Sequence, residues 1–110
     1  MADLTARHDF AMYEHFLTDL AGHAQDMDRA VEILENLERF LDAVLRALDL
    51  SVHTVVLASD HGNLEDLSTH QHTTNPVPTL VWGPGAQPLA ASVRTLADLA
   101  PAILRQLRVL

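Results

Sequence analysis

Hydrophobic and polar residues follow two different periods along this chain, and each period predicts a different kind of element. From Met27 to Asp49, apolar residues recur every three or four positions, as on one face of an amphipathic helix. Asp26 stands where such a helix needs an N-cap. His53–Ser59 is a short β-branched run, which is typical of a strand buried on both faces. Val77–Trp82 predicts a further strand, which begins only at Thr79 because prolines precede it.

The two flanking parts of the chain also carry signals of secondary structure. Phe10–Thr18 is rich in aromatic and apolar residues and predicts a strand, which ends at Asp19 and a turn at Gly22. The sequence GPGAQP, after the last predicted strand, is interpreted as a turn-rich connector.

A final helix is predicted near the carboxyl end. Thr95 and Asp98 have the spacing of a capping box, which indicates a helix through about Leu107. Pro101 falls inside that helix and argues against its continuity.

The order strand, helix, strand, loop, strand, helix predicts an α/β fold with a mainly parallel sheet flanked by helices. The chain of 110 residues is expected to form one domain, residues 1–110. Parallel sheets carry their sites beyond the carboxyl ends of their strands. Asp19 and Asp60 each follow a predicted strand, so we expect the two carboxylates at one rim of the sheet.

Composition and charge narrow the classes of partner. The chain is 48% hydrophobic and 20% charged and has no cysteine, which excludes disulfides and thiolate metal sites. Its formal charge of −8 disfavours nucleic acid as a partner, whereas two divalent cations would halve that charge. No apolar run approaches the roughly 18 residues needed to cross a membrane. We therefore expect a cytoplasmic protein with neither a nucleic-acid nor a membrane partner.

Candidate metal ligands gather in three polar segments. Asp60 and His61 are adjacent, Asp19 and His23 are four residues apart, and His72 lies in the next loop. Carboxylate oxygen and neutral imidazole nitrogen suit zinc, manganese or iron when thiolates are missing. Five such ligands could begin two cation sites, and two cations about 4 Å apart can align the oxygens of a phosphoryl transfer.

Each of these residues also has an ordinary structural interpretation. A single Asp after a strand is usually a turn former, and a single His is usually a surface residue. His8, His15 and His53 are interpreted in this way. His70 could be an outer-shell donor or a spare ligand, but it is not expected to bind metal.

Three motifs together carry a resemblance to a known family. DLAGH (Asp19–His23), SDHGN (Ser59–Asn63) and HTTNPVP (His72–Pro78) resemble the closing metal-binding motifs of the alkaline phosphatase superfamily. The most similar branch is that of cofactor-independent phosphoglycerate mutase and phosphopentomutase. The resemblance runs from about Phe10 onward and implies an alkaline-phosphatase-like fold, here truncated to a C-terminal portion.

The resemblance also implies a ligand set and a chemistry. Asp19, His23 and His72 would share one divalent cation, manganese or zinc, while Asp60 and His61 would hold the second. The intact enzyme would be a phosphatase, phosphodiesterase or phosphomutase acting on a phosphorylated small molecule.

The departures from the family pattern concern catalysis and assembly. Family members take their Ser or Thr nucleophile from an N-terminal half without counterpart here, so no catalytic residue is assigned and the chain alone is expected to be inactive or very weak. The truncated sheet predicts self-association or binding to a complementary N-terminal half. Two alternatives remain open: a metal-binding or interaction module without chemistry, and a structural domain whose polar loop is only solvated.

Overall fold

The chain forms two compact units, which are described separately. The computed structural model describes residues 2–109. The first unit comprises the described parts of Met1–Ala47 and His61–Val77. The second comprises those of Leu48–Asp60 and Pro78–Leu110.

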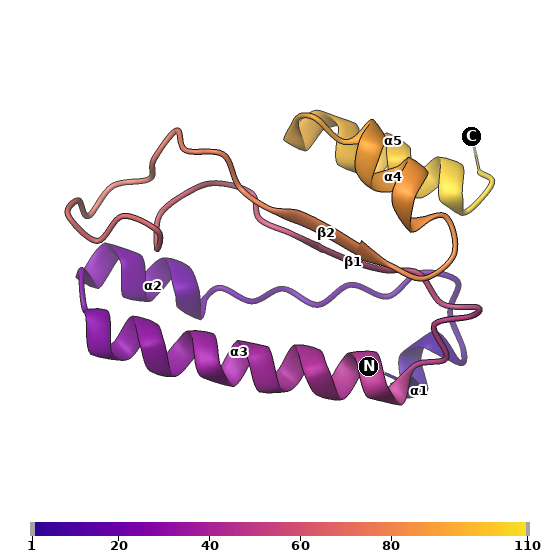
Figure 1. Ribbon diagram of the computed structural model, residues 1–110, viewed down its shortest axis with the longest axis horizontal. Coiled ribbons are helices and arrows are strands. Elements are labelled where there is room, and N and C mark those ends of the chain that lie inside the picture. Colours follow the sequence, from indigo (N-terminus) through magenta and orange to yellow (C-terminus); the bar gives the residue numbers. More distant parts are fainter. Residues whose placement is uncertain (1, 110) are drawn as a thin grey trace. The chain divides into compact units, whose positions relative to one another are not determined.

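Three helices and one long loop make up the first unit. The helices are α1 (Ala2–Thr5), α2 (Leu17–Ala24) and α3 (Met27–Ala47), and α2 lies alongside α3 (Figure 1). Gln25 reverses the chain between them in a left-handed conformation, φ 54°, and its N–H donates to the carbonyls at the end of α2. Asp26 then caps α3 by accepting a hydrogen bond from the Arg29 N–H at 3.0 Å, which confirms the predicted N-cap.

A small apolar core holds the loop His61–Val77 against the helices of the first unit. Ala21 on α2 and Ala30 and Ile33 on α3 are buried together. Leu64 and Leu67 from the loop pack against them. Burial of these side chains fixes the loop against α2 and the first turns of α3. This contact also positions the polar residues of the loop.

The second unit contains a two-stranded sheet and two helices. The strands β1 (Val55–Ala58) and β2 (Thr79–Trp82) pair antiparallel, with Val55 opposite Trp82 (Figure 1). After the turn at Gly83, φ 91°, come α4 (Ala86–Ser92) and α5 (Leu96–Gln106). The existence of both strands and the start of β2 at Thr79 match the sequence prediction. The expectation that the first strand is buried on both faces is wrong, because β1 is half-buried to exposed.

The prediction of a mainly parallel sheet is wrong for the part of the chain that the structure describes. β1 and β2 are joined by a loop without a helix, whereas parallel neighbours need a crossover of a dozen or more residues, usually helical. The chain instead turns back on itself, and the strands are only half-buried. The coarser prediction of an α/β architecture agrees with the elements observed.

The predicted strand Phe10–Thr18 is also wrong. Residues 10–16 have no regular structure, and α2 begins at Leu17. The side chains of Phe10, Tyr13 and Phe16 are more than half exposed. An apolar run becomes a strand only where a neighbouring strand pairs with it, and among residues 2–109 this run has no pairing partner.

The carboxyl end mixes one correction with one confirmation. The segment interpreted as a turn-rich connector is a turn only as far as Gly85, after which α4 begins at Ala86. The Thr95–Asp98 capping box is present, and α5 continues through Pro101 despite the missing N–H.

None of the helices in residues 2–109 combines the length and the apolar composition needed to span a bilayer.

Candidate metal centre

Helix α2 presents the first two candidate ligands on one face. Asp19 and His23 are four residues apart, and on a helix this spacing makes their side chains neighbours. The Nε2 atom of His23 lies 3.4 Å from Oδ2 of Asp19. The expectation that Asp19 follows a strand and meets His23 across a glycine turn is therefore wrong, yet the helix still brings the two groups together.

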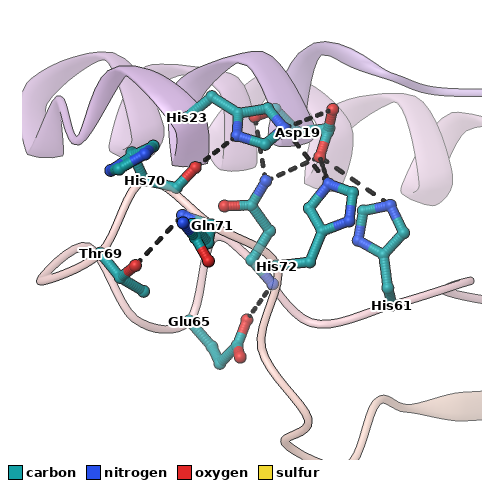
Figure 2. A network of polar contacts seen from close by, with 9 residues as sticks. Asp19, His23, His61, Glu65, Thr69, His70, Gln71 and His72 are labelled. Atoms are coloured by element: carbon teal, nitrogen blue, oxygen red, sulfur yellow. Dashed lines mark hydrogen bonds and ion pairs between the residues drawn. The ribbon is translucent and has the colours of Figure 1, made fainter.

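The loop of the first unit supplies two further imidazoles, those of His61 and His72. A β-bridge joins Gly62 to Thr73, and the Thr73 N–H donates to the Gly62 carbonyl at 2.8 Å. In this antiparallel bridge His61 and His72 are diagonal neighbours on the same face, and their rings stack with centroids 3.6 Å apart. Figure 2 shows both rings directed from the loop toward Asp19 on the helix.

The ligand atoms are spaced as a cation requires. His72 Nε2 lies 3.2 Å from Asp19 Oδ1 and 3.2 Å from His23 Nε2. Donors at about 2.1 Å from a tetrahedral cation stand roughly 3.4 Å from one another. Ligand atoms of Asp19, His61 and His72, one from each residue, lie within 4.8 Å of one another and could hold a divalent cation. His23 lies beside this group, with its Nε2 3.4 Å from Asp19 Oδ2 and 3.2 Å from His72 Nε2.

A backbone carbonyl fixes the tautomer of His23. Its Nδ1 lies 2.6 Å from the carbonyl oxygen of His70, and only a protonated Nδ1 can donate to that oxygen (Figure 2). The lone pair is then on Nε2, the atom that faces Asp19 and His72. His70 thus takes part as an outer-shell group, through its main chain and as an acceptor, where the sequence had suggested a side-chain donor.

Asp19 is the electrostatic centre of the group. A hydrogen bond from the Asn63 side chain, followed by the nearby His23, His72 and His61 rings, lowers the pKa of the Asp19 carboxyl below its usual value, although partial burial opposes this. The carboxylate is ionised at neutral pH and only about a third exposed. A negative charge surrounded by three imidazoles suits capture of a cation.

Two residues at this site were missed by the sequence analysis. Asn63 is 4% exposed and donates from Nδ2 to Asp19 Oδ1 at 2.6 Å. Glu65 accepts hydrogen bonds from the Asn63 N–H at 2.6 Å, from Asn75 Nδ2 at 3.0 Å and from the Thr73 hydroxyl. The sequence signal was their position directly after the Asp60–His61 pair.

Glu65 acts as a brace between two stretches of the loop. Its carboxylate ties residue 63, just after His61, to residues 73 and 75, just after His72. The same bonds, that from Thr73 foremost, lower the pKa of Glu65 to about 2. The brace holds the two imidazole-bearing stretches at a fixed spacing.

Asp60 is the remaining predicted ligand. It is exposed, belongs to the second unit and directly precedes His61 in the chain. Its role as a ligand therefore stays a prediction.

Comparison with known proteins gives consistent matches. The profile of the "Metalloenzyme superfamily" matches residues 2–109. Similar curated proteins include 2,3-bisphosphoglycerate-independent phosphoglycerate mutases from Methylobacillus flagellatus, Agrobacterium fabrum and Haloarcula marismortui, with 27%, 32% and 34% identity. These alignments cover 94%, 93% and 78% of this chain but 21%, 21% and 18% of the relatives. The chain thus spans about a fifth of the length of the curated relatives it matches.

No solved structure matches the chain. The sequence matches nevertheless confirm the resemblance that the three motifs indicated.

The Glu65 brace makes a testable contribution to stability. Because the pKa of Glu65 is lower in the folded protein than the ordinary value of 4.5, its contribution is present above about pH 4.5 and is lost as the pH falls toward 2. We expect Glu65→Gln to lower the free energy of unfolding at pH 7 by about 1 kcal/mol, a value reduced for solvent screening of an exposed side chain. Urea unfolding of both proteins from pH 7 to pH 2.5 should show this difference shrinking with acidification.

The matched control is Glu38→Gln, which removes an exposed carboxylate of α3. It should leave the unfolding free energy nearly unchanged at every pH. A constant difference between wild type and Glu65→Gln across this range would contradict the brace.

Proposed function

Because the chain belongs to the metalloenzyme superfamily, we propose that it is the divalent-cation-binding part of a phosphoryl-transfer enzyme. The observation that carries the proposal is the convergence of Asp19, His23 and His72. The Nε2 atoms of the two imidazoles are 3.2 Å apart, and they lie 3.4 Å from Oδ2 and 3.2 Å from Oδ1 of Asp19, respectively. Two segments nearly 50 residues apart in sequence place these atoms at cation spacing, which argues against a polar loop that is merely solvated.

Asp19, His23 and His72 are proposed as the ligands of one cation. His61 Nε2 is 3.9 Å from Asp19 Oδ1 and shares the group of possible ligands with Asp19 and His72. In line with the family resemblance, His61 is proposed as a ligand of an adjacent second cation. Asp60, its neighbour in the chain, is the other proposed ligand of that cation. The donors are oxygen and nitrogen only, which favours manganese or zinc.

The intact enzyme is proposed to act on a phosphorylated small molecule. The relatives are named phosphoglycerate mutases, and the formal charge of −8 means that an anionic substrate needs cations at the site. When bound, the two cations supply charge neutralisation at the phosphoryl oxygens. The described residues hold and orient the cations, while the nucleophile is proposed to come from a part of the enzyme that this chain does not include.

A second candidate is a metal-binding or interaction module without chemistry of its own. It is favoured by the number of apolar side chains that remain exposed, among them Phe10, Met12, Tyr13 and Phe16. Such a surface is typical of a protein that packs against another chain. Metal binding is common to both candidates, so catalysis is what separates them.

Metal uptake is the direct test of the proposed site. We expect the protein to bind Mn²⁺ or Zn²⁺ at micromolar concentration in isothermal titration calorimetry, and Asp19→Asn or His72→Ala to weaken binding by more than about tenfold. Imidazoles must be neutral to bind, so the metal should be released between about pH 7 and pH 5. His8→Ala, which removes an exposed histidine outside the proposed ligand set, is the matched control and should bind as wild type does.

Hydrolysis of a phosphate ester separates the two candidates. With added Mn²⁺ we expect at most slow hydrolysis of p-nitrophenyl phosphate, because cation-activated water is then the sole nucleophile. That activity should fall in Asp60→Asn. Equal background rates in wild type and Asp60→Asn would favour the module without chemistry.

The exposed apolar side chains predict association. We propose that they are covered by a second copy or by a complementary N-terminal half, since burying them removes apolar area from water. Size-exclusion chromatography with light scattering should show the apparent mass rising with protein concentration, and Phe16→Ser should reduce this rise. A concentration-independent monomer would contradict self-association.

A further inference from the structure

We propose that Asn63 is a positioning residue, which orients the Asp19 carboxylate for cation binding. This inference rests on the metal site proposed above, and it assigns a role to a residue that contributes no ligand atom to that site. Four independent features of the structure support it.

The first feature is the bond between the two side chains. Asn63 Nδ2 donates to Asp19 Oδ1 at 2.6 Å and also to the Asp19 backbone carbonyl at 3.2 Å. The Asn63 side-chain amide thus donates to both the side chain and the main chain of Asp19, which lies 44 positions earlier in the sequence. The two contacts fix the rotation of the carboxylate, because Oδ1 is held while Oδ2 stays toward His23.

The second feature is the room that α2 leaves for Asn63. Gly22 is buried within the helix, and a Cβ atom at this position would lie 2.1 Å from Asn63 Oδ1 and 2.5 Å from Asn63 Cγ. Glycine costs helix stability relative to alanine. Its presence three residues after Asp19 is explained by the close approach of the Asn63 side chain.

The third feature is an acceptor left unpaired. Within the described residues, Asn63 Oδ1 is buried and accepts no hydrogen bond. The opposite orientation of the amide would direct Oδ1 at the Asp19 carboxylate, and two oxygen acceptors repel each other. An unpaired buried oxygen is unfavourable for folding, and such costs are typical of functional sites.

The fourth feature is the hold on Asn63 itself. Its backbone N–H donates to Glu65 Oε2, and the same carboxylate binds Thr73 and Asn75. Asn63 is therefore fixed at its main chain by the brace and at its side chain by α2. Asn63 therefore links the loop to the Asp19 carboxylate. This link keeps Asp19, His23 and His72 at the spacing that a cation needs, even in the metal-free protein.

Calorimetric titration of the 110-residue protein with Mn²⁺ alone tests the inference. Asn63→Ala should weaken Mn²⁺ binding by about ten- to a hundredfold, the usual effect of losing an outer-shell partner. The matched control is Asn36→Ala, which removes an exposed amide of α3 that contacts Arg39 and should change the affinity by less than about threefold. Circular dichroism confirms that each variant is folded before titration.

A second variant and a spectrum separate positioning from simple support of the fold. Gly22→Ala should favour the helix intrinsically but displace Asn63, so it should weaken Mn²⁺ binding as Asn63→Ala does. The visible absorption bands of bound Co²⁺ report ligand geometry, and they should shift in Asn63→Ala and not in Asn36→Ala.

A metal-free measurement tests the hydrogen bond itself. In the apo protein, the Asn63 side-chain amide protons should exchange with solvent much more slowly than those of the exposed Asn36. Equal exchange rates would overturn the inference. The inference would also be overturned if wild type binds Mn²⁺ and Asn63→Ala weakens that binding no more than Asn36→Ala does. That result would leave the proposed function intact. Failure of wild type itself to bind Mn²⁺ would overturn both.

Discussion

The carboxylate of Asp19 is the point on which the first unit depends. It receives the Asn63 amide from the loop, lies beside His23 on its own helix, and has His72 and His61 within 4 Å. Each of these groups could be satisfied by water alone. These groups lie around one carboxylate because Leu64 and Leu67 of the loop pack against the buried cluster of Ala21, Ala30 and Ile33. This small apolar cluster therefore determines where the polar side chains of the loop lie relative to α2.

In the polar network, groups farther from Asp19 hold the residues that contact Asp19. The His70 carbonyl holds Nδ1 of His23, which leaves Nε2 for the site, and Glu65 holds the backbone of Asn63, which leaves its amide for Asp19. The His70 carbonyl and the Glu65 carboxylate thus restrain His23 and Asn63 through atoms that do not face Asp19. This is the arrangement expected of a site that must bind a cation without reorganising.

The small core explains why so much apolar surface remains. In the described part of the chain, only Ala21, Ala30, Ile33, Leu89 and Ala102 form the buried apolar set. Many of the large apolar side chains, including Met12 and Phe16, are exposed, and the segment before α2 has no strand partner among residues 2–109. The chain spans about a fifth of the length of the relatives it matches.

The sequence by itself determined the elements whose signals are local and the residue types that make the chemistry. Helix α3 with its Asp26 cap, strand β2 beginning at Thr79, and the Thr95–Asp98 capping box follow from neighbouring residues, and so do the acid and imidazole pairs. Only the tertiary structure decided that Asp19 and His23 lie on a helix, that β1 and β2 run antiparallel, and that Asn63 and Glu65 order the site. The physical reason is range: capping and periodicity act over a few residues, whereas strand pairing and outer-shell hydrogen bonds join segments tens of residues apart.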